Sequence, residues 1–357
     1  MLSDHGFRGA GGLRPKISSC TNCSWCYAAS TRGARGWNID RLLIVWLCRL
    51  YPPRLDPPLK VRQSKGYNRC NFADPRETID GFRKLQINVA VQGKVAYATI
   101  NNPPVNVITP PLLDEFVRLS AEFAAHEDLL VVVLRSANPD FFIAHFDVSS
   151  ILKFPTDKPA RYEDYANAFY HDMCERFRLM NKITIAQIEG RVGGGGSELA
   201  MSCDMRFGVR GKTIVNQMEV PLGILPGGTG TQRMPRLIGR NRAIEVILAG
   251  IDMDADTADR WGYLNRAFEP GMISSYVEWL AQRIASFPAE AVRLTKAAIN
   301  SADKPLADGF RDESYLFQQL VRTDSGRENM RKFLEIGGQT REGELKIQEL
   351  NGLLGKF

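Results

Sequence analysis

The sequence predicts an α/β fold. Between about residues 86 and 273, short β-branched strands alternate with helices, and this alternation is typical of a sheet covered by helices. A hydrophobic content of 44% over 357 residues is ample for a buried core. From about Ser274 the sequence is helical in character. We therefore predict three regions, which are an extension over residues 1–85, an α/β core over 86–273 and a helical region over 274–357.

The extension is basic and poor in structural signals. Residues 1–85 carry 15 Lys and Arg against 6 Asp and Glu, whereas the rest of the chain carries 31 against 34. Proline pairs interrupt the extension and no helical or strand period persists, so we expect most of it to be disordered. The extension thus carries a formal charge of 15 − 6 = +9 and the rest of the chain 31 − 34 = −3, so the sequence after residue 85 does not indicate nucleic-acid binding. An Arg-rich, acid-poor start is also compatible with a transit peptide.

The cysteines and the apolar runs bear on metal binding, on the redox compartment and on membrane insertion. Cys20, Cys23 and Cys26 are spaced like metal ligands, but no fourth ligand stands at a usual distance, so we predict no metal site. Seven cysteines without a regular framework are typical of a reducing compartment. The most apolar run, Leu42–Cys48, has seven residues, far short of the roughly 20 that cross a bilayer. We predict a cytoplasmic protein without a membrane span, or an organellar one if the extension is a transit peptide.

The first half of the core begins with a predicted hairpin. Residues 86–100 alternate apolar and polar side chains around Gly93, which is a hairpin signal. Pro110 opens a helix that runs through about Ala125. The next predicted elements are a buried strand over Leu129–Leu134, a loop from Ser136 to Asp147, a helix over 161–181 and a strand over Ile183–Ile188.

The second half of the core contains two glycine-rich turns. The first, Gly193–Gly196, opens a helix on whose apolar side Cys203 is expected to pack. The second, Leu225–Gly230, has no Lys-Ser/Thr after it, so a turn that shapes a pocket is favoured over a phosphate-binding loop. Other predicted elements are short strands over Asp204–Val209 and Thr213–Val215 and a helix over Gln232–Leu237.

The first glycine run and the carboxylate after it form the strongest candidate site. Because glycine lacks a Cβ, such a run can present bare backbone N–H groups to an oxygen. The first turn of a helix adds free amides and the positive end of its dipole. Fixed donors of this kind make an oxyanion hole, beside which Glu198 would serve as acid or base. The alternative is a flexible turn followed by a solvated glutamate.

Four blocks, in order along the chain, resemble the crotonase (enoyl-CoA hydratase/isomerase) family. The resemblance covers about residues 86–300 and implies a crotonase-like ββα superhelix core with a C-terminal helical region. The blocks are AYATINNPPVNV (Ala96–Val107), FIAHFD (Phe142–Asp147), EGRVGGGGSELAMSCD (Glu189–Asp204) and EVPLGILPGGTGTQRMPRLIG (Glu219–Gly239).

The resemblance implies the chemistry of an enoyl-CoA hydratase. It places the backbone N–H groups of Phe146 and Gly195 in an oxyanion hole for the thioester oxygen of an acyl-CoA. It gives Glu198 the task of positioning and activating water for attack at C3 of a 2-enoyl-CoA. Glu219 then exchanges the proton at C2, and the product is a 3-hydroxyacyl-CoA.

The resemblance also implies a coenzyme A side of the site and an assembly. The loop around Asp147 would border the CoA adenine, with Val107 and Ala144 offering backbone contacts, although Asp147 alone also fits a plain helix N-cap. Coenzyme A enters as part of the substrate, and no separate cofactor is implied. Family members are usually trimers or dimers of trimers, so the expected partners are an acyl-CoA and further copies of the chain.

Two features depart from the family pattern. His145 stands where glycine is usual and Phe146 replaces a small residue. His145 is either a catalytic or acyl-contacting group, or a side chain turned to solvent or to the pantetheine path. Glu219 lies 21 residues after Glu198, one more than in the hydratase pattern compared. An extra residue in the turn Val209–Lys212 would absorb this difference.

The alternative functions are another crotonase reaction, such as isomerisation, dehydration or thioester hydrolysis, and a non-catalytic scaffold whose basic arm binds RNA or a partner.

Overall fold

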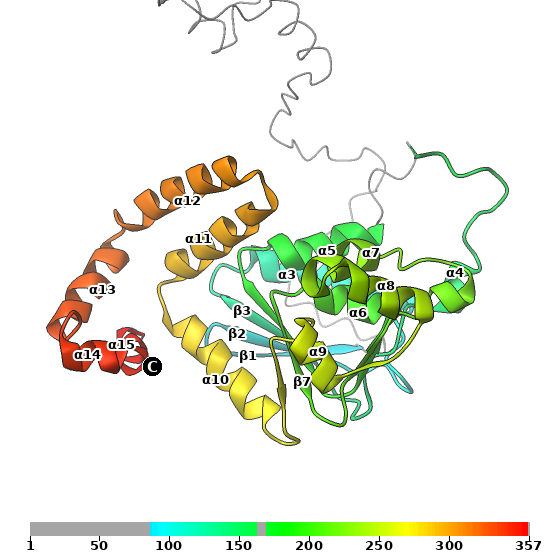
Figure 1. Cartoon of the computed structure of the whole chain (residues 1–357), viewed down its shortest axis with the longest axis horizontal. Helices are drawn as coiled ribbons and strands as arrows, with labels where there is room; N and C mark the ends of the chain where they lie inside the picture. The colour runs from blue at the N-terminus through cyan, green and yellow to red at the C-terminus, as the bar shows by residue number, and fades with distance from the viewer. Residues whose placement is uncertain (1–85, 163–168, 356–357) are drawn as a thin grey trace, which may run out of the picture. The chain divides into compact units, whose positions relative to one another are not determined.

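A computed structural model describes residues 86–162 and 169–355 of the chain (Figure 1). The predictions for the extension over residues 1–85, including its disorder, the spacing of Cys20, Cys23 and Cys26 and the transit peptide, lie outside the described residues.

The main sheet has six strands and begins with the predicted hairpin. Strands β1 and β2 pair antiparallel with Gln92 opposite Val95, and Gly93 takes a positive φ of 58° between them. Each later strand runs parallel to its neighbour, because a helix connects it to the one before. The order is β1 (Ile87–Gln92), β2 (Val95–Ile100), β3 (Val131–Ser136), β5 (Ile183–Ile188), β7 (Met205–Val209) and β10 (Arg266–Phe268).

A smaller sheet of four short strands carries the loops of the site. The predicted loop from Ser136 to Asp147 is wrong in one respect, since it contains β4, and β6 was not predicted at all. Both strands have three residues, too few to show a period of two in the sequence. The order is β4 (Phe141–Ile143), β6 (Arg191–Gly193), β8 (Ile214–Asn216) and β9 (Met253–Asp254).

Helices of the core follow the predicted pattern with shifted ends. Helix α3 (Pro110–Ala125) starts at the predicted proline, which suits the first helical turn because its missing N–H has no partner there. The helix predicted over 161–181 is confirmed as α5 (Phe169–Leu179) within the described residues. The other core helices are α4 (Val148–Ile151), α6 (Gly194–Met201), the 3-10 turn η2 (Val220–Leu222), α7 (Gly230–Ile238), α8 (Arg240–Ala249) and α9 (Ala255–Trp261).

The region from about Ser274 is helical, as predicted. Neither α12 nor α13 buries any of its residues, although both carry large apolar side chains. The elements are α10 (Ile273–Ser286), α11 (Ala289–Asn300), the 3-10 turn η3 (Ser301–Asp303), α12 (Leu306–Leu320), α13 (Asp324–Glu335), α14 (Arg341–Leu345) and α15 (Ile347–Leu354).

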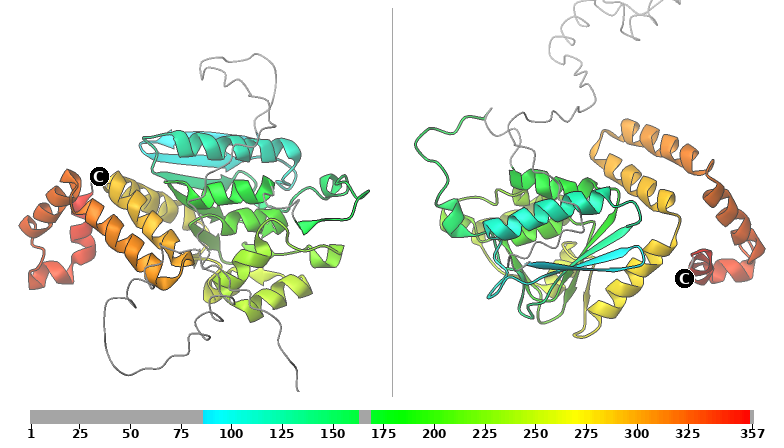
Figure 2. Two further views of the ribbon diagram at one scale, coloured as in Figure 1. Left: turned by 90° about the horizontal axis from the view of Figure 1, so that it is seen from above. Right: turned by 180° about the vertical axis from the view of Figure 1, so that it is seen from behind.

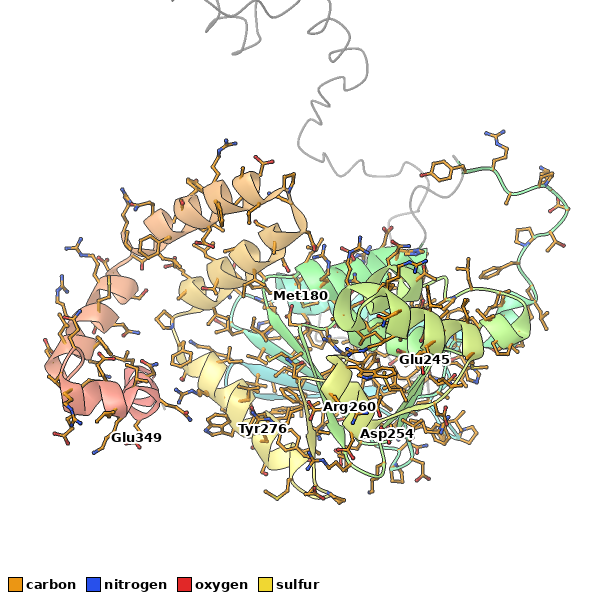
Figure 3. All side chains as sticks on the ribbon, in the orientation of Figure 1. Met180, Glu245, Asp254, Arg260, Tyr276 and Glu349 are labelled. Atoms are coloured by element: carbon orange, nitrogen blue, oxygen red, sulfur yellow. The ribbon has the colours of Figure 1, made fainter. Side chains whose placement is uncertain are left out.

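Helices lie against the main sheet (Figure 2), and two clusters of buried apolar side chains cover its two faces. Side chains of a strand alternate between faces, so Ala96 faces the cluster beneath α3, α5 and α6, while Tyr97 faces the cluster beneath α10. The ring of Tyr276 on α10, which Figure 3 labels, packs against the ring of Phe268 on β10 with centroids 4.6 Å apart and planes tilted by 41°. Burial on both faces fixes the strands, and the loops at their ends are thereby held in place.

Candidate active site

The glycine run forms a junction between β6 and α6 without any intervening loop. Strand β6 ends at Gly193 and the helix begins at Gly194, which has a φ of +45°. A Cβ at Gly194 would lie 2.8 Å from Oε1 of Glu219, so both the backbone conformation and the space require glycine there. The first turn of α6, with its unpaired amides, therefore points into the site.

Gly195 and Phe146 lie next to each other, because they follow β6 and β4, which are paired strands of the small sheet. Gly195 is the second residue of α6, so its N–H has no carbonyl partner within the helix. A Cβ built on Gly195 would lie 3.1 Å from Cβ of Phe146 and 3.5 Å from its backbone nitrogen. The two backbone donors suggested by the resemblance are thus close neighbours in the folded chain.

The N–H of Phe146 is directed away from Ile108, the residue with which Phe146 forms an isolated β-bridge. Ile108 donates to the carbonyl of His145 over 2.8 Å and accepts from the N–H of Asp147 over 3.1 Å. Backbone groups alternate in direction along an extended chain, so the N–H of Phe146 points to the opposite side. No acceptor for this N–H is found among the residues that the structure describes. Phe146 can therefore donate to a ligand despite its large side chain.

Glu198 is buried and held by a second glycine-rich turn. Its side chain is only 3% exposed, and Oε1 accepts the N–H groups of Gly228 and Gly230, each over 2.7 Å. Burial raises the pKa of Glu198 to about 7, and the charge of Glu219 adds to this, while the two backbone hydrogen bonds oppose it. The alternative of a solvated glutamate after a flexible turn is wrong.

Glu219 faces the same cavity from the residue that precedes η2. It is 9% exposed, and its Oε2 is buried without a hydrogen-bond partner among the described residues. Burial raises the pKa of Glu219, and the nearby His145 lowers it to a smaller extent. The turn Arg210–Lys212, with Gly211 at a φ of +72°, separates β7 from β8 where the extra residue was expected.

A cavity of ≈ 310 Å³ lies between these groups. The aromatic residues Phe154, Tyr162 and Tyr165 precede α5 in a sequence whose pattern assigns none of them to a pocket, and the structure separates two of them: Tyr162 is 94% exposed, whereas Phe154 lines the cavity. Tyr165 lies outside the described residues. The cavity is lined by Glu198 and Glu219, by Phe146 and Gly195, and by a largely apolar wall that includes Ile151, Phe154, Tyr170, Ile224 and Leu225.

The sequence did not reveal the roles of three residues in or beside the cavity. Tyr170 lies on α5, and nothing in its local sequence marks it, because its contacts are with Gly195 and Phe146 far along the chain. Gly228 and Gly230 were predicted only to shape a pocket. Their role as donors to Glu198 follows from the fold of the turn, which brings two amides onto one carboxylate oxygen.

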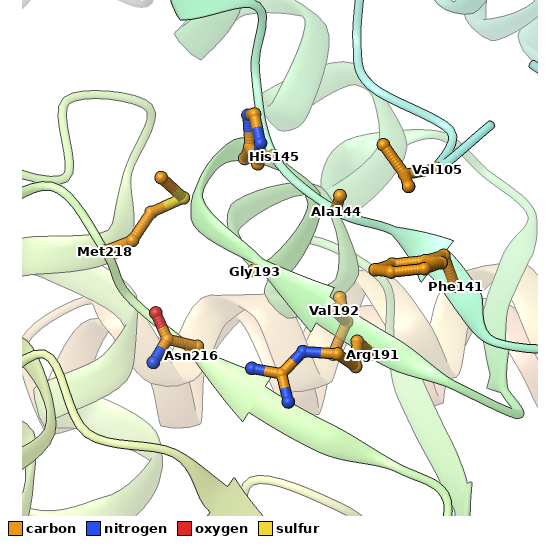
Figure 4. A pocket seen from close by; sticks show the side chains of 9 residues that line it. All are labelled: Val105, Phe141, Ala144, His145, Arg191, Val192, Gly193, Asn216 and Met218. Atoms are coloured by element: carbon orange, nitrogen blue, oxygen red, sulfur yellow. The ribbon is translucent and has the colours of Figure 1, made fainter. Parts of the chain in front are cut away.

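The residues expected on the coenzyme A side are only partly together. Ala144 lines a second cavity of ≈ 220 Å³ that also contains His145 and Met218 (Figure 4). The carbonyl of Val107 already accepts from Asn102 and Thr109, and Val107 does not line this cavity.

Asp147 is the N-cap of α4. Its carboxylate accepts from the N–H of Ser149 over 3.0 Å and from the hydroxyl of Ser150 over 2.7 Å. These hydrogen bonds, that of Ser150 foremost, lower the pKa of Asp147. The plain capping role is therefore present.

His145 lines the second cavity rather than the one between the glutamates. Its Nδ1 lies 2.8 Å from the carbonyl oxygen of Phe146, and Figure 4 shows the ring near Met218 and Ala144. Cβ of His145 nevertheless lies near Gly194, since a Cβ built on Gly194 would come within 3.1 Å of it.

Other sequence predictions concern the rest of the chain. Cys203 is buried in the core beside α6, as expected. Over residues 86–162 and 169–355 there is no group of three or more His, Cys, Asp and Glu that could hold a metal ion. Within the same residues, no helix is long and apolar enough to cross a membrane.

Comparison with known proteins identifies the family. Residues 90–342 match the family model described as enoyl-CoA hydratase/isomerase. The short-chain-enoyl-CoA hydratase of Clostridium acetobutylicum is 33% identical over 248 residues, which cover 68% of this chain and 92% of that protein. The 2,3-dehydroadipyl-CoA hydratase of Escherichia coli K12 is 29% identical over 259 residues, or 70% and 96% of the two chains.

A solved structure gives the same result at the level of the fold. Enoyl-CoA hydratase subunit I of Geobacillus kaustophilus superposes with a TM-score of 0.64 at 32% identity, over 72% of this chain and 97% of that one. The chain thus has the crotonase fold, an α/β core with C-terminal helices. The chain is therefore a member of the crotonase (enoyl-CoA hydratase/isomerase) family.

Proposed function

We propose that this protein is an acyl-CoA enzyme that adds water to a 2-enoyl-CoA and releases a 3-hydroxyacyl-CoA. One observation carries the proposal. Two buried carboxylates, Glu198 and Glu219, line a single cavity beside the backbone N–H groups of Phe146 and Gly195. Coenzyme A enters as part of the substrate, and we propose no further cofactor.

The chemistry assigns one task to each group. As the oxygen of water bonds to C3, Glu198 takes one of its protons, and the electron pair of the double bond moves toward the thioester carbonyl. The negative charge that gathers on the thioester oxygen is held by the N–H groups of Phe146 and Gly195. Glu219 then gives a proton to C2. The product has gained one hydroxyl and one hydrogen, and solvent returns both carboxylates to their starting states.

The environment of the carboxylates supports this division. A base works best when its pKa lies near the working pH, and burial raises the pKa of Glu198 to about 7. Burial also raises the pKa of Glu219, and this second carboxyl group lines the same cavity, where it can exchange a proton with C2. Double-bond isomerisation moves a proton and needs no water, so a second buried carboxylate favours hydration over it. Dehydration is the reverse of the proposed reaction.

The coenzyme A side, the assembly and the compartment complete the proposal. Ala144, together with Val107 and Asp147, remains our candidate for backbone contacts with CoA. We propose that copies of the chain form a trimer or a dimer of trimers through residues 274–357, because α12 buries none of its side chains. We place the reaction in the cytoplasm, or in an organelle if residues 1–85 include a transit peptide.

Kinetics of glutamate variants test the proposal. We expect Glu198→Gln and Glu219→Gln each to lower kcat for crotonyl-CoA hydration at least about 100-fold, the usual contribution of a general acid or base. The matched control is Glu122→Gln, which removes an exposed carboxylate on α3 that pairs with Arg118. Full activity in Glu198→Gln would refute the role of this residue, and equal losses in the control would show that the assay reports folding instead.

A further inference from the structure

Tyr170 touches three backbone segments of the site, and the proposed reaction gives it no role. Its hydroxyl donates to the carbonyl of Gly195 over 2.5 Å. Its ring meets the ring of Phe146 edge-on, with centroids 5.8 Å apart and planes at 88°. The same ring lies against Gly228, where an added Cβ would come within 2.6 Å of two ring carbons. One side chain thus spans the oxyanion loop, the first turn of α6 and the turn that holds Glu198.

The hydroxyl of Tyr170 restrains a residue that cannot restrain itself. Gly195 has no side chain that could be packed in place, and its N–H in the first turn of α6 has no partner within the helix, so contacts from outside the helix help to fix the direction of this N–H. Its N–H and carbonyl are separated by only two rotatable bonds, so fixing the carbonyl limits the direction of the N–H. Burial raises the pKa of Tyr170 well above its ordinary value, which keeps the hydroxyl protonated and able to donate.

The ring of Tyr170 restrains the other donor. Phe146 stands where the family usually has a small residue, and its side chain is only partly buried. An edge-on contact with Tyr170 gives that side chain one preferred place. Since the backbone on either side of Phe146 is paired with Ile108, the ring contact and the strand pairing together define the direction of the N–H.

We propose that Tyr170 is a positioning residue, which holds the two oxyanion donors of Phe146 and Gly195 at the spacing that the charged thioester oxygen requires. This inference rests on the proposed function of the site. It predicts that Tyr170 contributes when charge develops on the oxygen and contributes little to binding of the uncharged substrate. Phe146 and Tyr170 act as a pair, so the large residue in the oxyanion loop is matched by the tyrosine on α5.

The test removes only the hydroxyl, with the variant Tyr170→Phe. We expect kcat for crotonyl-CoA to fall about tenfold to about a hundredfold, as when reacting groups lose their alignment, with KM within about twofold of wild type. The control is Tyr263→Phe, which also deletes a buried hydroxyl bonded to α6, in this case to Oγ of Ser197 over 2.9 Å. We expect this control to keep kcat within about threefold of wild type, because it removes a comparable hydrogen bond away from the donors.

Two ligands separate positioning from a general loss of structure. Acetoacetyl-CoA binds an oxyanion hole as its enolate, whereas butyryl-CoA carries no charge on its acyl oxygen. We expect Tyr170→Phe to lose affinity for the enolate by about the factor lost in kcat and to keep its affinity for butyryl-CoA within about twofold. Equal affinities of variant and wild type for the enolate, or equal losses for both ligands, overturn the inference.

A second variant covers the case in which Tyr170→Phe does not fold. Phe146→Leu keeps the backbone donor and removes the ring contact, and we expect it to weaken enolate binding more than butyryl-CoA binding. If it weakens neither, the inference fails. If the wild-type protein hydrates crotonyl-CoA and both variants equal it in kcat and in affinity for the enolate, only the role of Tyr170 is contradicted. A wild-type protein that hydrates no enoyl-CoA contradicts the proposed function itself.

Discussion

At the scale of single residues, the site depends on a carboxylate kept almost free of water. Glu198 was identifiable in the sequence because it follows four glycines at the start of a helix. Its burial and its two backbone donors were not, since Gly228 and Gly230 come from a turn 30 and 32 residues away. Tyr170 was missed for the same reason, because its partner Gly195 is 25 residues distant. Local sequence shows which groups are present and tertiary contacts decide what each one meets.

The raised pKa of Glu198 predicts how stability depends on pH. The folded chain holds this proton up to about pH 7, whereas the unfolded chain releases it near 4.5. Between these values the folded state binds more protons, so this residue makes the free energy of unfolding fall by about 3 kcal/mol as pH rises through the window. In the variant Glu198→Gln this position does not titrate, so its contribution to the free energy of unfolding does not fall with pH. The amide oxygen of the glutamine can still accept hydrogen bonds from Gly228 and Gly230.

Urea unfolding of both proteins measures the effect. We expect Glu198→Gln to gain about 3 kcal/mol relative to wild type between about pH 4.5 and about pH 8, most of it below pH 7. The comparison with wild type cancels groups that titrate alike in both proteins. A difference between the two that stays constant over this range would mean that Glu198 titrates normally.

At the scale of elements, pattern predicted the long strands and helices and failed for the short ones. The hairpin, α3 and β5 were predicted because six to sixteen residues show a clear period or a proline start. Strands β4 and β6 were missed because three residues are too few to show a strand period. The small sheet that they form carries both the oxyanion loop and the glycine run. The least predictable elements are therefore those that place the site.

Two neighbouring glycines test how the turn before α7 supports Glu198. A Cβ at Gly228 would overlap the ring of Tyr170 and the carboxylate of Glu198, whereas one at Gly227 comes no closer than 3.7 Å to Leu225. We expect Gly228→Ala to lose about 1–3 kcal/mol of stability through overpacking, and kcat to fall about 100-fold through displacement of the carboxylate. Gly227→Ala should keep wild-type stability and lose much less activity. Similar values for the two variants would contradict the close packing of this turn.

At the scale of the whole molecule, the C-terminal helices expose large apolar side chains. Phe310 and Phe317 of α12 are 58% and 59% exposed. Large apolar side chains gathered on one exposed helix mark an interaction surface. A chain of 39.9 kDa that trimerises there would have a mass of about 120 kDa in solution.

Light scattering with chromatography tests this assembly. We expect a trimer or a multiple of it for the wild type, and dissociation when Phe310→Ser and Phe317→Ser are combined, because the interface loses two large apolar groups. Gln319→Ser, an exposed polar change on the same helix, is the control and should leave the mass unaltered. A wild-type protein that elutes as a monomer at micromolar concentration would contradict the proposed role of α12.

The central claim is that Glu198 and Glu219 add water to an enoyl-CoA, and the mass of the product tests it most directly. Crotonyl-CoA is turned over in water enriched in heavy oxygen, and the acyl-CoA is analysed by mass spectrometry. We predict intact 3-hydroxybutyryl-CoA with one heavy oxygen on the acyl chain, formed at rates that fall together in both glutamate variants. An isomer without heavy oxygen, or free coenzyme A with the label in a released acid, would contradict the account.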